Sequence, residues 1–173
     1  MQLLTFTIDD RRYGIDTRRV VEVLPLVIPR PLPRQPAEVL GLIRYRGRFL
    51  PSIDLGQVIA GRRCRDRLGT RTIVVRLEHE QPASPAPLQL ALVAEDVIGI
   101  TSAAAPPALP LVVDGPFGPM VELAGETGSG QPAQLLAIDT ILPAPQMATL
   151  LGLAGASASP PPATDSDAVT PSP

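Results

Sequence analysis

Residues that could perform chemistry are few in this chain of 173 residues. It has one histidine, His79, one cysteine, Cys64, and no lysine. A nucleophilic serine or cysteine would have to use His79 as its base, and Schiff-base chemistry or a P-loop lysine is excluded. The same counts exclude disulfides and sites for zinc, haem or iron–sulfur clusters that are built from sets of histidine and cysteine.

The sequence also lacks the common catalytic and nucleotide-binding motifs. The sequence contains no G-x-S-x-G, H-E-x-x-H or G-x-G-x-x-G pattern. The adjacent acids Asp9-Asp10 and Glu95-Asp96 fit turns better than an acid–base pair, because neighbouring side chains on a strand point to opposite faces. We therefore predict a protein that is not an enzyme, with no catalytic residues, no metal and no cofactor.

A dense basic segment lies in the first half of the chain. Its arginines are Arg62, Arg63, Arg65, Arg67 and Arg71. On a small β-barrel, the segment Arg62–Arg71 could bind single-stranded nucleic acid, which is the alternative function. Such binding normally adds stacking aromatic residues, and this segment has none, so a solvated loop is favoured. Cys64 lies among these arginines, which would lower a thiol pKa; a redox-sensing role is a third, more distant hypothesis.

A second arginine-bearing segment predicts a contact with another protein. Two apolar runs, Val39–Tyr45 and Phe49–Asp54, flank Arg46-Gly47-Arg48, which indicates a hairpin with glycine at the tight position. Arginine recurs at every second position from 44 to 48, so the three side chains share a face if the strand continues unbroken. Arginine is enriched at the centres of protein interfaces and binds carboxylates through its planar fork. The alternative is a charged, solvent-facing edge that prevents aggregation.

The charge is divided unevenly along the chain. Residues 1–76 hold all 15 arginines and seven acids, a net charge of +8, whereas residues 77–173 hold ten acids and no arginine, a net charge of −10. This division predicts either a basic contact surface in the first half or two halves that neutralise each other across an internal interface.

Short strands dominate the predicted secondary structure. We expect strands at 4–8, 13–15, 23–28, 39–45, 49–54, 72–77, 88–94, 97–101, 120–123 and 135–138, and short helices at 18–21, 55–60, 140–142 and 147–153. About ten short strands with few helices indicate an all-β fold made of small barrels or a sandwich.

One domain and a tail account for the whole length. Residues 1–153 form the predicted domain, and residues 154–173, rich in proline, alanine and serine, form a predicted disordered tail. We find no apolar run long enough to span a membrane and no secretory signal. A cytoplasmic location is therefore expected, and the single unpaired cysteine agrees with it.

Four stretches match, in order, the motifs of one known family. Leu4–Ile15 is similar to that family's opening hairpin, and Val20–Leu24 to its V-x-E-V/I segment. Pro31–Ile43 is similar to P-x-x-P-x-x-V-x-G-V/I, and Tyr45–Leu55 to the hallmark N-L-R-G-x-x-L-P-V-V-D-L. Together they resemble the CheW family, the adaptor domains of bacterial chemosensory arrays. The later strands fit only loosely, so specific motifs end at Leu55.

The resemblance implies two five-stranded SH3-like β-barrel subdomains that share a hydrophobic core, with short helices. It also implies an adaptor without catalysis that couples the cytoplasmic tip of a methyl-accepting chemoreceptor to a CheA-type histidine kinase. With such partners the protein would associate with membrane receptor arrays without inserting into the membrane, and no nucleic acid is expected.

The family's receptor contacts carry over to matching positions. They are Val20, Glu22, Gly41, Arg46 and Gly47. Arg44 and Tyr45 replace the family's usual Asn and Leu, which implies an altered receptor specificity. The segment Val20–Val27 and Tyr45, taken together, most resemble the accessory adaptors of Wsp-like surface-sensing systems. No motif defines the kinase-binding surface, which is left unknown.

Overall fold

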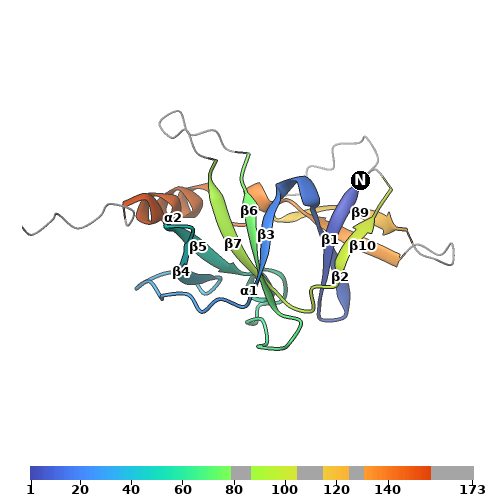
Figure 1. The fold of residues 1–173 in the computed structure, drawn as a ribbon, viewed down its shortest axis with the longest axis horizontal. Helices are drawn as coiled ribbons and strands as arrows, with labels where there is room; N and C mark the ends of the chain where they lie inside the picture. The colour runs from blue at the N-terminus through green and yellow to red at the C-terminus, as the bar shows by residue number, and fades with distance from the viewer. Residues whose placement is uncertain (79–86, 105–114, 125–130, 157–173) are drawn as a thin grey trace, which may run out of the picture.

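In the part of the chain that the structure describes, ten strands form two five-stranded sheets that lie side by side (Figure 1). The computed structural model describes residues 1–78, 87–104, 115–124 and 131–156. The first sheet has the order β8-β1-β2-β10-β9 and consists of β1 (Gln2–Ile8), β2 (Arg11–Asp16), β8 (Gly99–Ser102), β9 (Phe117–Leu123) and β10 (Gln131–Leu136). The second sheet has the order β3-β6-β7-β5-β4 and consists of β3 (Val20–Pro25), β4 (Val39–Tyr45), β5 (Arg48–Asp54), β6 (Arg71–Arg76) and β7 (Gln89–Ala94).

Each sheet is closed into a small barrel. In the first sheet, Ala103, directly after β8, bridges to Leu123 of β9, so the two edge strands meet. In the second sheet, the chain returns after β3, and Arg30 bridges to Leu42 of β4 through backbone hydrogen bonds of 2.8 and 2.9 Å. The all-β prediction of two five-stranded barrels is confirmed.

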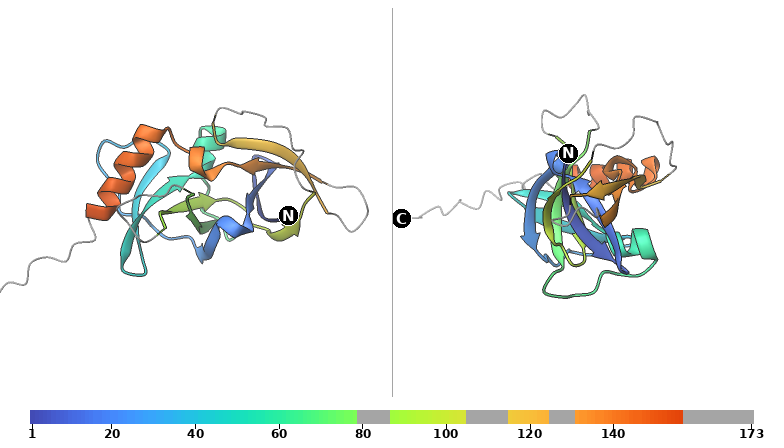
Figure 2. Two further views of the ribbon diagram at one scale, coloured as in Figure 1. Left: turned by 90° about the horizontal axis from the view of Figure 1, so that it is seen from above. Right: turned by 90° about the vertical axis from the view of Figure 1, so that its right-hand side faces the viewer.

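The first barrel is assembled from both ends of the chain. Strands β1 and β2 come from the first 16 residues, whereas β8, β9 and β10 come from the second half. The parallel pairing of β2 with β10 joins the two parts. The two views of Figure 2 show the same arrangement, with β9 and β10 beside the N-terminal hairpin.

One hydrophobic core spans both barrels. Side chains of the first sheet, including Phe6 and Ile15, pack in one cluster with side chains of the second, including Ile73 and Leu92. The helix α2 (Ala144–Ala156) adds Leu150 to this cluster. Each barrel also has a smaller cluster of its own. The shared core explains why neither half of the chain forms a separate domain.

Local sequence sets the turns that join these strands. The turn between β1 and β2 places Asp9 and Asp10 at φ values of 47° and 61°, and the β4–β5 turn places Arg46 and Gly47 at 47° and 79°. Positive φ at both central residues gives the hairpin turn that matches the strand twist. The helix α1 (Leu55–Ala60) follows β5 and ends at Gly61, which is left-handed, as predicted.

Three elements differ from the prediction. The expected helix at 18–21 is instead a short 3-10 turn, η1 (Thr17–Arg19), and β3 begins directly after it at Val20. The β-branched residues after Arg19 pair with β6 and override the weak helical signal. A second 3-10 turn, η2 (Ile138–Thr140), precedes α2 and replaces the short helix that is expected at 140–142.

The C-terminal helix is longer than predicted. Residues 154–156 belong to α2, where Ala154 is buried, although we had assigned them to the tail. The rest of the predicted tail, 157–173, lies outside the described residues, as does His79. Within the described ranges, no helix is long and apolar enough to cross a membrane.

Candidate protein-binding site

Glu22, Tyr45 and Arg46 meet where the edge strands of the second barrel approach each other. The Tyr45 hydroxyl donates a hydrogen bond of 2.5 Å to Glu22 Oε2, and Arg46 Nη2 donates one of 2.8 Å to the same oxygen. The Arg46 guanidinium also lies 5.1 Å from the centre of the Tyr45 ring. The three side chains therefore join β3 to the β4–β5 turn without any backbone pairing between those strands.

The residues of this group differ in their exposure to solvent. Tyr45 is buried and packs in the second barrel's own cluster, whereas the Arg46 side chain is 71% exposed. The hydrogen bond to Glu22, together with burial, raises the pKa of Tyr45 above its ordinary value of 10.0. At neutral pH the phenol therefore holds its proton and stays a donor to Glu22, while Arg46 presents its guanidinium to solvent.

The structure brings together three of the five predicted receptor contacts. Glu22, Arg46 and Gly47 lie at one place. Val20 lies on the other side of a bulge in β3, and its side chain packs against the shared core. Gly41 is buried, and a Cβ atom there would lie 2.0 Å from the carbonyl oxygen of Arg30.

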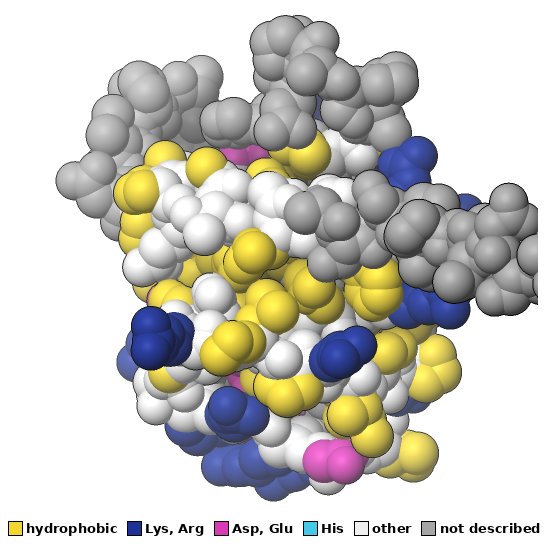
Figure 3. Space-filling model, turned by 90° about the vertical axis from the view of Figure 1, so that its left-hand side faces the viewer, with side chains coloured by type: hydrophobic (Ala, Val, Ile, Leu, Met, Phe, Trp, Pro, Cys, Tyr) yellow, Lys and Arg dark blue, Asp and Glu magenta, His cyan; other side chains and the backbone are white. Residues whose placement is uncertain are grey.

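The three alternating arginines do not share a face. Arg44 pairs with Phe49 across the hairpin, whereas Arg48 pairs with Tyr45 and so lies on the Tyr45 side. The turn at Arg46-Gly47 breaks the alternation, which is the reason for the difference from the expectation. Figure 3 shows the end of the molecule that carries β4 and α2, where hydrophobic side chains gather centrally with arginines among and around them.

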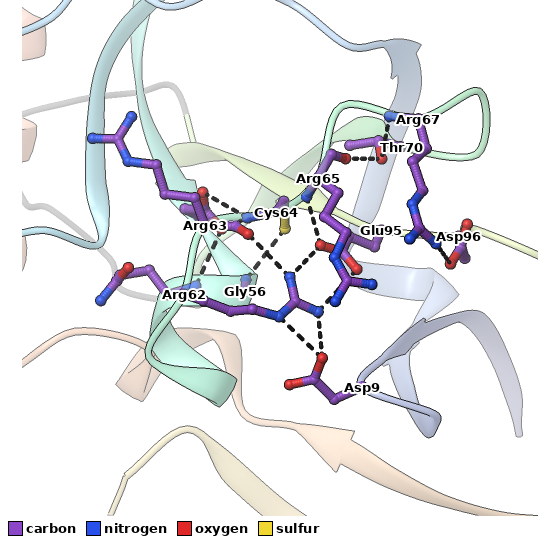
Figure 4. A network of polar contacts seen from close by, with 12 residues as sticks. Asp9, Gly56, Arg62, Arg63, Cys64, Arg65, Arg67, Thr70, Glu95 and Asp96 are labelled. Atoms are coloured by element: carbon purple, nitrogen blue, oxygen red, sulfur yellow. Dashed lines mark hydrogen bonds and ion pairs between the residues drawn. The ribbon is translucent and has the colours of Figure 1, made fainter.

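Part of the basic segment Arg62–Arg71 makes contacts within the chain (Figure 4). Arg62 donates to Asp9 in the β1–β2 turn and to Glu95 after β7, at 2.5 Å for the Glu95 Oε1 contact. Arg71 donates to the carbonyl oxygens of Leu68 and Thr70. These contacts hold the loop against both barrels, so the nucleic-acid alternative is not favoured.

Glu95 is the buried centre of this network. Its side chain is 2% exposed and accepts hydrogen bonds from Arg62 and from the backbone N–H of Arg65. Burial would raise the pKa of Glu95, but these donors outweigh it and hold the pKa below its ordinary value of 4.5. The carboxylate is therefore charged at neutral pH and fixes the start of the loop.

The Cys64 thiol is a packed group rather than a reactive one. Its Sγ accepts a hydrogen bond from Gly56 N and donates one to the Val93 carbonyl, both at 3.3 Å. Burial, followed by the nearby Asp54 carboxylate, raises the pKa of Cys64 far above the ordinary value. The arginines nearby do not lower it, and the redox hypothesis has no support in this geometry.

Several acids of the second half pair with arginines of the first. Arg19 binds Asp139 at 2.6 Å and Glu78 at 2.8 Å, Arg62 binds Glu95, and Arg67 lies 3.9 Å from Asp96. The uneven charge division thus serves, in part, an internal interface. Sequence inspection missed these pairs because their members lie between 29 and 120 residues apart.

Two SH3-like barrels around one core define the fold class, and the family model described as a CheW-like domain matches residues 2–146. The chain belongs to the CheW-like family.

Known relatives and a solved structure agree with this assignment. The chain is 34% identical to Protein FrzA of Myxococcus xanthus over 71 residues, which cover 41% of this chain and 43% of FrzA. It is 39% identical to Chemotaxis protein CheW of Treponema pallidum (strain Nichols) over 54 residues, or 31% and 32% of the two chains. The chain thus matches less than half the length of these curated relatives.

The structural match covers more of the fold. The scaffolding protein TtCheW from Thermoanaerobacter tengcongensis superposes with a TM-score of 0.63 at 18% identity, over 82% of this chain and 87% of that one. At this identity the match supports the shared fold.

Proposed function

We propose that this protein is a non-enzymatic chemosensory adaptor that couples the cytoplasmic tip of a methyl-accepting receptor to a CheA-type histidine kinase. It acts in the cytoplasm and reaches receptor arrays through these partners. The observation that carries the proposal is the family match over residues 2–146, combined with an exposed arginine at the family's hallmark position, next to the buried Tyr45.

The receptor contact is centred on Arg46. Its guanidinium is exposed, while Tyr45 beneath it is buried and hydrogen-bonded, so the hairpin presents the cation without needing to order itself on binding. Glu22 and Gly47 lie beside it. A carboxylate or a helix-end carbonyl on the receptor tip is the matching partner chemistry.

Two of the carried-over positions, the buried Gly41 and the half-buried Val20, act through the shape of the surface. Gly41 lets the segment at Arg30 lie directly on β4, and Val20 joins the β3 segment to the shared core. In this proposal both residues fix the position of Glu22 and Arg46 rather than touch the receptor through large side chains. The assignment to the Wsp-like subgroup stays a prediction.

The test is a binding measurement with a purified receptor-tip fragment. Arg46→Glu is expected to weaken receptor binding by at least about tenfold, because it replaces a cation at the contact by an anion. Arg63→Glu is the matched control: the same charge change at an exposed arginine in the loop after α1, at the opposite end of β5. If Arg46→Glu binds the receptor fragment as well as the unchanged protein does, or if both variants lose the same amount of affinity, Arg46 is not the receptor contact.

A further inference from the structure

The pairing between β2 and β10 stops short in the first barrel. Within the described residues, their parallel ladder consists of Tyr13 with Gln134 and Gly14 with Leu135. The residues that precede this ladder, at the start of each strand, pair only with the outer neighbours: Arg11 and Arg12 with β1, and Gln131 and Pro132 with β9. The two strands are therefore unpaired with each other at this end, and the gap between them is called the seam.

A hollow of about 700 Å³ occupies this seam. Binding pockets for ligands fall in the same range of volume, roughly 300–1,000 Å³. One wall, from β2 and the turn before it, carries Arg11, Arg12 and Tyr13 together with the acid Asp10. The facing wall, from β9 and β10, carries Met120, Pro132 and Gln134. The hollow thus has one wall with two arginines and one acid, and one wall of apolar and amide groups.

Two features suit this hollow to an extended peptide. Within the described residues, Arg12 lines the hollow and takes part in no ion pair or side-chain hydrogen bond, so its guanidinium is available to a partner. Arg11, by contrast, already interacts with the Tyr13 hydroxyl and with Asp9. Met120 is 55% exposed in the facing wall, a large apolar side chain at a site open to solvent. An extended chain alternates its side chains, so acidic residues can face one wall while apolar residues face the other.

We propose that this hollow is a docking site for an extended acidic segment of a partner protein. The segment lies between β2 and β10, with a carboxylate on Arg12 and its apolar side chains on Met120 and Pro132. This contact goes beyond the proposed function, because it lies on the first barrel, whereas Arg46 lies on the second. It stands whether or not the receptor binds at Arg46.

The test uses a fluorescent, end-capped six-residue peptide of alternating glutamate and valine, titrated with the full-length protein. Matched peptides replace glutamate by glutamine or lysine, and an oligothymidine probe tests nucleic acid. The acidic peptide is expected to bind and the other probes to bind at least about tenfold more weakly, since each charged hydrogen bond contributes strongly. Raised salt is expected to weaken the acidic peptide's binding.

Two variants locate the site. Arg12→Glu is expected to lower the peptide's affinity at least tenfold, and Arg34→Glu, the same change at an exposed arginine of the second barrel, to leave it unchanged. Gln131→Trp, at an exposed position of the rim, is expected to block the hollow without reversing a charge. The proposal is overturned if no peptide binds, if Arg34→Glu lowers the affinity for the acidic peptide as much as Arg12→Glu does, or if oligothymidine binds best. Circular dichroism confirms that each variant is folded.

Discussion

Replacement of Gly41 by alanine tests how the second barrel holds its binding surface. Gly41 has a φ of +133° and lies under the backbone of Arg30 and Pro31, which runs across β4 to close the barrel. A Cβ atom at this position would lie 2.0 Å from the Arg30 carbonyl oxygen and 2.8 Å from Pro31 Cα. Both neighbours are backbone atoms, so no side-chain rotation can relieve the overlap.

Two costs combine in Gly41→Ala. A residue other than glycine in such a backbone region costs on the order of 1–3 kcal/mol. Overpacking a filled site costs typically about 1–3 kcal/mol more. We therefore expect the free energy of unfolding to fall by roughly 2–6 kcal/mol, a large part of the about 5–15 kcal/mol typical of a domain.

Gly47→Ala is the matched control. Gly47 also has a positive φ, +79°, but no atom lies within 4 Å of the position a Cβ would take. Only the backbone cost remains, about 1–2 kcal/mol for a left-handed residue. The difference between the two variants isolates the contact of Gly41 with the segment at Arg30.

The assay is urea unfolding followed by far-UV circular dichroism. With a slope of about 2 kcal/mol per molar urea, the middle of the usual range, Gly41→Ala should lower the unfolding midpoint by roughly 1–3 M, with little change in slope. The reasoning is refuted if Gly41→Ala and Gly47→Ala have the same midpoint. It is refuted equally if Gly41→Ala unfolds like the unchanged protein.

Three further predictions concern the core and the buried ionisable groups. Phe6→Ala, which removes a fully buried ring stacked on Tyr13, is expected to cost about 3–5 kcal/mol in urea unfolding; a loss under 1 kcal/mol would contradict the packing. Because the folded-state pKa of Glu95 lies below 4.5, the stability that its charge contributes is complete above that pH and is lost as the pH falls through the folded-state pKa. Glu95→Gln should therefore make the free energy of unfolding less dependent on pH on the acid side. The same pH dependence in the variant and the unchanged protein would refute this. Iodoacetamide should alkylate Cys64 far more slowly in the folded protein than in urea at pH 8, since burial raises the pKa of the thiol; equal rates would show that the thiol is accessible.

Local pattern was sufficient to predict most of the fold. The hairpin around Gly47 and the helix that ends at Gly61 depend on neighbours in sequence, and both form where predicted. The segment at Arg18–Val21 was predicted wrongly because the β3–β6 pairing, which determines its structure, involves residues more than 50 positions away.

The candidate site was predictable only in part. The arginines of the hairpin indicated a contact surface at Arg46, and the family resemblance added Glu22. That these two residues meet depends on barrel closure, which no local pattern encodes. The role of Tyr45 was missed, although an aromatic residue at a position where the family has leucine was a usable signal. The Arg62 network was missed because a run of arginines looks the same in sequence whether it faces solvent or internal acids.

The central claim is that one protein joins two partners at separate surfaces. Sedimentation velocity of the protein mixed with a receptor-tip fragment and the regulatory domain of a CheA-type kinase tests it most directly. We predict a ternary complex, and we predict that Arg46→Glu loses the receptor fragment but still sediments with the kinase domain. If the protein sediments alone in the presence of both partners, or if each partner displaces the other, the adaptor function is contradicted.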